Sequence, residues 1–112
     1  MSLTTHAKSS TLLGVKAVQV VRDRIAYSDE IFAEVVVWRL AAPSQGSKHF
    51  YKYRLAYVVS GECVLRYDNE SGKGDHRHFR GEEFKYSFRS IEQLLVDFHN
   101  EVRRMNHEDG RA

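Results

Sequence analysis

The sequence predicts an α+β fold, an antiparallel β-meander of four to five strands with a C-terminal α-helix packed on one face. Three observations predict it. Runs of β-branched and aromatic residues fill most of the chain between polar turns. Ser60-Gly61 joins two such runs by a two-residue connection, which is typical of a β-hairpin. Apolar residues then recur at helical spacing from Ile91 to Met105.

The first two strands come from the N-terminal half of the chain. Residues 15–21 are mostly β-branched and 24–27 continue the pattern, so we expect one strand there. After a polar turn, Ile31–Leu40 is apolar on both faces, which predicts a central strand with both faces covered. Trp38 is therefore expected in the core.

Lys48–Val59 and Glu62–Asn69 form the clearest hairpin. The two-residue connection predicts a register that places Leu65 opposite Ala56 and Tyr67 opposite Arg54. Polar residues gather at its open end, on one face Lys52, Arg54, Tyr67 and Asn69, and on the other Tyr53, Arg66 and Asp68.

The last elements are a short edge strand over 84–88 and a helix. Ser90 and Gln93 have the spacing of a capping box at the start of that helix. Its apolar stripe is expected to contact the apolar residues of the hairpin, namely Ala56, Val58, Cys63 and Leu65.

The length of 112 residues is that of one domain with a single core. We expect a flexible N-terminal arm over 1–14, the domain over 15–106 and a polar tail over 107–112.

Cys63 is the only cysteine, and its apolar strand predicts a buried, inert thiol. The net charge of +2 does not by itself indicate a nucleic-acid partner. Without a disulfide, a membrane-length apolar run or a signal pattern, the chain is expected to be cytoplasmic.

The stretch from Arg66 to His78 carries the candidate site. Its many charged residues and two histidines are poor core builders, because burying such groups unpaired costs several kcal/mol. A metal-free phosphodiester site fits these residue types, since RNA cleavage by the 2′-hydroxyl needs a base, an acid and cations on the phosphate. We expect the catalytic residues to be His76, His78, Arg66 and Asp68. We expect the substrate-binding residues to be Lys52, Tyr53, Arg54, Tyr67, Asn69, Lys73 and Arg77, with Tyr53 or Tyr67 stacking a base.

The two histidines are expected in a glycine-containing loop that folds back over one face of the hairpin. One imidazole should then reach Arg66 or Asp68, because an Asp–His pair fixes the tautomer for proton transfer. The remaining histidines are interpreted as incidental to function, namely His6, His49, His99 and His107.

Two alternatives remain open at this stage. The His-x-His pair, with Asp68 or Glu70, could serve a metal-dependent hydrolase, but the neighbouring Lys and Arg side chains disfavour a divalent cation, so no metal or other cofactor is expected. The basic segment could instead bind a nucleic acid or a protein without catalysis.

Several motifs resemble the TumE family of small proteins. They are Lys52–Val59, Cys63–Glu70, Gly72–His78, the Val37-Trp38 strand and the Leu94-Leu95-x-Asp97-Phe98 helix, so that the resemblance covers about residues 15–100. It implies the toxin of a type II toxin–antitoxin module. The implied partner is a helix-turn-helix antitoxin encoded in an adjacent gene, and RNA is a possible second partner. If so, an acidic antitoxin segment is expected to cover the basic stretch around Lys73 and Arg77.

Overall fold

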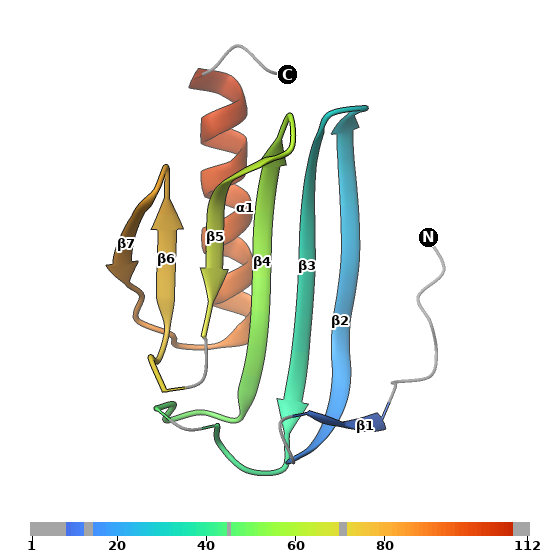
Figure 1. The fold of residues 1–112 in the computed structure, drawn as a ribbon, viewed down its shortest axis with the longest axis vertical. Helices are drawn as coiled ribbons and strands as arrows, with labels where there is room; N and C mark the ends of the chain where they lie inside the picture. Colours follow the sequence, from blue (N-terminus) through green and yellow to red (C-terminus); the bar gives the residue numbers. More distant parts are fainter. Residues whose placement is uncertain (1–8, 13–14, 45, 70–71, 109–112) are drawn as a thin grey trace.

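The computed structural model describes residues 9–12, 15–44, 46–69 and 72–108. Within these ranges, seven antiparallel strands form one sheet in chain order, and one helix follows them. The elements are β1 (Ser9–Leu12), β2 (Val15–Ser28), β3 (Ile31–Leu40), β4 (Tyr51–Val59), β5 (Glu62–Asp68), β6 (His76–Phe79), β7 (Glu82–Lys85) and α1 (Ile91–Glu108). In Figure 1 the helix lies behind β4 and β5, and the described residues place no helix over the front of the sheet. The α+β meander is confirmed, with more strands than the four to five predicted.

The extra strands come from both ends of the meander. Residues 9–12, within the predicted arm, pair with β2 as β1, whereas 1–8 and 13–14 lie outside the described residues. Residues 82–85 pair with β6, so the edge strand begins two residues before the predicted range. The helix continues to Glu108, into the predicted tail, and residues 109–112 are not described. No helix in the described ranges is long and apolar enough to cross a membrane.

The β4–β5 register differs from the prediction. Val58 pairs with Cys63 as expected, but Tyr57 then pairs with Leu65, so that Val64 is the extra residue of a β-bulge. A shift of one residue moves side chains to the opposite face. Leu65 and Tyr67 therefore face the helix, while Arg66 and Asp68 face away from it.

His76 and His78 lie on strand β6, which corrects their predicted place in a loop. Arg80 and Gly81 connect β6 to β7 with φ angles of 48° and 86°, the left-handed values of a primed two-residue turn. The strand alternation then directs His76 and His78 to one face of the sheet and Arg77 to the other.

The core lies between α1 and the face of the sheet that it covers. Leu94 and Phe98 of the helix are fully buried against strand residues, and the Ser90 hydroxyl caps the helix by accepting a hydrogen bond from the Gln93 amide at 3.0 Å. The rest of the core cluster is Ala33, Val35, Val37, Tyr53, Leu55, Tyr57, Leu65, Tyr67, Val102 and Met105. Of the four hairpin residues predicted to contact the helix stripe, Leu65 belongs to this cluster.

Trp38 and Cys63 are not core residues, contrary to prediction. Trp38 is partly exposed and pairs across the sheet with Lys52, on the face opposite Val37. Cys63 is exposed, beside the turn that ends the hairpin. Both errors arise because an apolar run of residues does not reveal whether one face of the strand or both faces are covered.

Candidate functional site

The uncovered side of the sheet, which we call the open face, carries two rows of paired residues that run across the strands. Within a row, each residue lies directly opposite the next one on the neighbouring strand, and each row contains either His76 or His78. The first row is Arg22, Val36, Arg54, Asp68, His76 and Lys85. The second row is Arg24, Glu34, Ala56, Arg66, His78 and Glu83. The four residues predicted to be catalytic are thus neighbours on β5 and β6.

Asp68 is the buried centre of this group. Its side chain is 4% exposed, and Oδ2 accepts a hydrogen bond of 2.8 Å from Arg66 Nε. Asp68 Oδ1 is buried without a hydrogen-bond partner among the described residues, and His78 Nε2 lies 3.7 Å from it. The predicted approach of an imidazole to Asp68 is confirmed, whereas the roles of these residues remain predictions.

The Glu83 carboxylate of β7 lies close to both imidazoles. Its Oε2 lies 3.6 Å from His78 Nε2 and 3.2 Å from His76 Nδ1. His76 Nε2 donates a hydrogen bond of 2.7 Å to the Lys73 carbonyl oxygen. His76 Nδ1 is buried and, although close to Glu83, makes no hydrogen bond with any described residue. The sequence reasoning missed Glu83, although an Arg80-Gly81 turn would have placed it opposite His78.

On the open face, the basic side chains make fewer hydrogen bonds and ion pairs than the acidic ones. Arg22 and Arg54 are exposed, and within the described ranges neither has a hydrogen-bond or ion-pair partner. Arg24 is involved in a long contact of 3.6 Å with Glu34. Lys52, also predicted to bind substrate, donates a hydrogen bond of 3.0 Å to the Asn69 carbonyl oxygen. The open face thus retains positive charge that is available to an anion.

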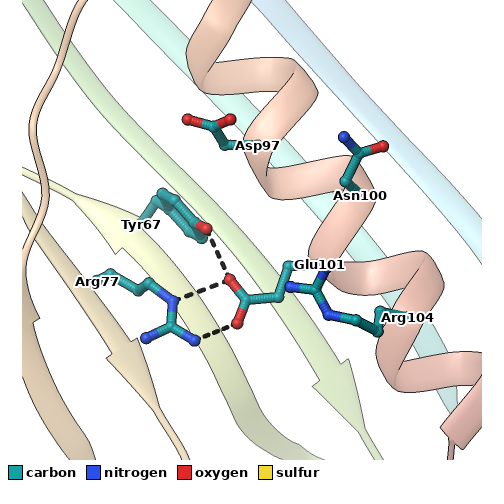
Figure 2. Close-up of a pocket in the computed structure, with 6 residues that line it drawn as sticks. All are labelled: Tyr67, Arg77, Asp97, Asn100, Glu101 and Arg104. Carbon is teal, nitrogen blue, oxygen red and sulfur yellow. Dashed lines mark hydrogen bonds and ion pairs between the residues drawn. The ribbon is translucent and has the colours of Figure 1, made fainter.

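Arg77 and Tyr67 lie on the opposite side, under the helix. Figure 2 shows both directed at Glu101 of α1. Tyr67 Oη donates to Glu101 Oε1 at 2.6 Å, and Arg77 donates through Nε at 2.9 Å and through a second nitrogen to the other carboxylate oxygen. Burial raises the pKa of Glu101, but these hydrogen bonds outweigh burial and hold that pKa below its ordinary value. The helix thereby fixes the strand that carries the histidines.

Tyr53 and Asn69 also have internal partners. Tyr53 is 2% exposed and its hydroxyl donates to Asp75 Oδ1 at 2.6 Å. Asn69 is 1% exposed, and its amide bridges the Tyr53 amide and the Tyr51 carbonyl oxygen. Buried rings cannot stack on a base, so the suggested stacking by Tyr53 or Tyr67 is inconsistent with this structure. Of the seven predicted substrate-binding residues, Arg54 and Lys73 are exposed. Lys52 and Arg77 are partly exposed, and each has an internal partner.

His49 is not incidental to the structure. The Tyr51 amide donates to its Nδ1 at 3.1 Å, so Nε2 carries the proton and donates to Asp75 Oδ1 at 2.8 Å. Its ring also stacks on Phe88 at 3.8 Å between centroids. Burial raises the pKa of Asp75, but the hydrogen bonds from His49 and Tyr53 outweigh burial and lower it. This cluster links the residues before β4 to the start of β6.

The metal alternative has limited support in the geometry. Across the ranges that the structure describes, no group of three or more His, Cys, Asp or Glu side chains is arranged to hold a metal ion. Arg66 already occupies one oxygen of Asp68. Glu70, the other acidic candidate, lies outside the described residues.

Comparison with known proteins identifies the family. Neither the curated proteins nor the solved structures gave a match. A protein family described as Toxin TumE matches residues 6–106, nearly the whole chain and more than the range predicted from the motifs. The chain therefore belongs to the TumE toxin family.

Proposed function

We propose that the open face is the active site of a metal-independent endoribonuclease, and that this activity makes the chain the toxin of a type II toxin–antitoxin module. Family membership supports a toxin with an antitoxin partner. The observation that carries the catalytic part is the cluster of Arg66, Asp68, His76 and His78 around one buried carboxylate. A buried carboxylate beside an imidazole is an arrangement that orients a group for proton transfer.

His78 is the proposed general base. Asp68 and Glu83 both lie near its Nε2, which favours the tautomer with the proton on that atom. Nδ1 then has the free lone pair. It accepts the proton of the RNA 2′-hydroxyl while the 2′-oxygen forms a bond to phosphorus. Asp68 and Glu83 stabilise the imidazolium that results.

His76 is the proposed general acid. The proposal uses the protonated ring, in which Nε2 donates to the Lys73 carbonyl oxygen and Nδ1 lies 3.2 Å from Glu83 Oε2. The ring gives a proton to the 5′-oxygen as the bond between that oxygen and phosphorus breaks. The products are a 2′,3′-cyclic phosphate and a 5′-hydroxyl, and no metal or further reactant is required.

Arg54 and Arg66 are the proposed phosphate ligands. Arg54 lies opposite Asp68 in the register of β4 and β5. Its exposed guanidinium has no hydrogen-bond or ion-pair partner within the described ranges. Arg66 uses Nε on Asp68, which leaves its two terminal nitrogens for a phosphate oxygen. Cations at this position stabilise charge on the pentacovalent phosphorus.

RNA cleavage in the presence of EDTA tests the proposal. His76→Ala and His78→Ala should each lower the cleavage rate by about 10²- to 10⁴-fold, the usual contribution of general acid–base catalysis. His107→Ala is the matched control, because His107 is an exposed histidine near the end of α1. Cleavage that needs a metal would favour the hydrolase alternative. Equal rates in all three variants would refute the roles of the two histidines, and no cleavage by the unmodified protein would favour a binding module without catalysis.

The antitoxin is proposed to be a helix-turn-helix protein encoded in an adjacent gene, which inhibits by covering the site. The charge of this region calls for an acidic segment on the antitoxin. Arg77 is unsuitable for testing this contact because it pairs with Glu101 under the helix. Charge reversal at Lys73 and Arg54, which are exposed, should slow association and weaken the complex. Unchanged binding in that double variant would place the interface elsewhere.

A further inference from the structure

We propose that a single-stranded RNA crosses the open face from His76 on β6 to Arg22 on β2 and stacks one base on Trp38. This inference rests on the proposed function and deepens it, because it names the class of substrate and the residues that hold it away from the cleaved bond. It assigns roles to Arg22 and Trp38, which lie outside the catalytic cluster.

The route follows the first cross-strand row. Direct pairing links His76 to Asp68, Asp68 to Arg54, Arg54 to Val36 and Val36 to Arg22. Neighbouring strands are ~4.8 Å apart, so the four intervals from β6 to β2 span about 19 Å. This distance accommodates several nucleotides of an extended strand.

Charge favours an anionic occupant along this route. Arg54 and Arg22 stand at its middle and far end, both exposed and without a partner in the described part of the chain. The single acid in this row, Asp68, is almost completely buried and already bound by Arg66. A phosphate backbone therefore meets cations without a competing exposed carboxylate in the same row.

Trp38 lies beside this route and supplies a stacking surface. It follows Val36 by two residues on β3, so both side chains project from the same face. Its cross-strand neighbours are Lys52 and Gln19, and its indole is partly exposed. Farther along β3, the Arg24 guanidinium lies 3.8 Å from the centroid of the Phe32 ring, which gives a second planar group on this face.

The sheet favours a single strand over a duplex. Stacking on Trp38 requires a base that is free of its own neighbours, and bases in an RNA duplex are stacked and paired. An uncovered sheet with cations and an exposed aromatic ring is a known way of binding unpaired RNA. Cleavage through the 2′-hydroxyl also needs a flexible backbone at the cleaved bond.

Trp38 is the only tryptophan in the chain, so its fluorescence reports directly on this contact. The experiment titrates the full-length protein with an oligouridylate of about 12 nucleotides and, separately, with an RNA duplex of similar length. The uncleavable 2′-deoxy oligouridylate serves as a third probe, which separates binding from catalysis. We expect the single-stranded probes to quench and shift the emission and the duplex to do so much less.

Variants then test the route by anisotropy of a labelled oligouridylate. Arg22→Ala and Arg54→Ala should each weaken binding by roughly tenfold and lower the slope of log K against log salt concentration by about 0.7. Trp38→Ala should weaken binding about tenfold or more with little change in that slope, because stacking is not ionic. Arg103→Ala is the matched control, an exposed arginine on α1. Circular dichroism verifies that each variant is folded.

The outcomes separate this inference from the proposed function. Binding by this route, either without cleavage or with cleavage that the histidine variants leave unaffected, would uphold the route and refute the catalytic assignment. Oligouridylate that leaves Trp38 emission unchanged, or binding that falls in Arg103→Ala and not in Arg22→Ala, would overturn the route even if cleavage occurs. Quenching by an acidic peptide in place of RNA would overturn it as well, and would assign the open face to a protein partner.

Discussion

The two faces of the sheet use the same kinds of residue in different ways, and the tripeptide His76-Arg77-His78 shows the difference within one strand. Arg77 points under the helix and donates to Glu101, whose almost fully enclosed carboxylate also accepts a hydrogen bond from Tyr67. His76 and His78 point to the open face, where Asp68 keeps an unpartnered oxygen among the described residues. Charged groups that satisfy one another hold a fold together, whereas incompletely satisfied groups remain available for a ligand or a reaction.

The comparison also explains how the helix can support a site that it does not touch. Glu101 binds Arg77 from one side of β6, and the two histidines project from the other side of the same strand. The covered face therefore fixes the backbone position of the open-face cluster. Changes under the helix should lower stability first, and changes on the open face should lower activity first.

The largest expected effect comes from breaking the buried pair under the helix. Glu101→Ala leaves the partly exposed Arg77 guanidinium and the buried Tyr67 side chain without their acceptor. It should lower the free energy of unfolding by about 3–5 kcal/mol, measured by urea denaturation. Glu101→Gln keeps the shape and should lose less. A loss below about 1 kcal/mol for Glu101→Ala would show that the pair is solvated and that the two faces do not differ as described.

A second effect compares apolar truncation on the two faces. Leu94→Ala should lower the free energy of unfolding by about 2–5 kcal/mol, because Leu94 is fully buried and leaves a cavity. Leu95 is only partly buried and should lose less when truncated. Val36→Ala on the open face should lose least of the three, since a side chain that is partly exposed leaves no enclosed cavity. Equal losses at Leu94 and Val36 would mean that the open face is covered in solution.

The smallest effect is a dependence of stability on acid pH. The pKa of Glu101 is held below its ordinary value of 4.5, so its stabilising contribution is complete above that pH and is lost as pH falls through the lower folded pKa. The lowered pKa of Asp75 acts in the same direction. Unfolding free energies measured from neutral to acid pH should therefore fall, and the fall should be shallower in Glu101→Gln. Parallel curves for the two proteins would contradict this origin.

Much of the fold follows from local patterns. The bounds of β3 and the first residue of α1 match the predictions, because a continuous apolar run and a capping serine are local signals. The Ser60-Gly61 turn is also as predicted, with φ angles of 50° and 80°. The bulge at Val64 was not predictable in this way, since no glycine marks it and only packing against the helix selects it. Because of this bulge, Tyr67 lies on the face that the helix covers and not, as predicted, on the face that carries Arg54.

The candidate site was also predicted in part, because some of its geometry follows from local patterns. Arg66 and Asp68 share a face in either register because they are two residues apart, and that parity also keeps His76 with His78. Long-range partners gave no local signal. Asp75 lies 26 residues from His49, and Glu101 lies 24 residues from Arg77, so these pairs follow only from the folded topology. Glu83 was an exception, since it is specified by a neighbouring turn that was not recognised.

The most direct test of the account compares two adjacent residues of β6 in both stability and activity. His78→Ala should leave the free energy of unfolding within roughly 1 kcal/mol of the unmodified protein while RNA cleavage falls by about 10²- to 10⁴-fold. Arg77→Met should lower the free energy of unfolding by about 3–5 kcal/mol, because it leaves Glu101 buried without its cation, while the folded fraction still cleaves RNA. The opposite result, with His78→Ala active and Arg77→Met as stable as the unmodified protein, would contradict the division of roles between the two faces.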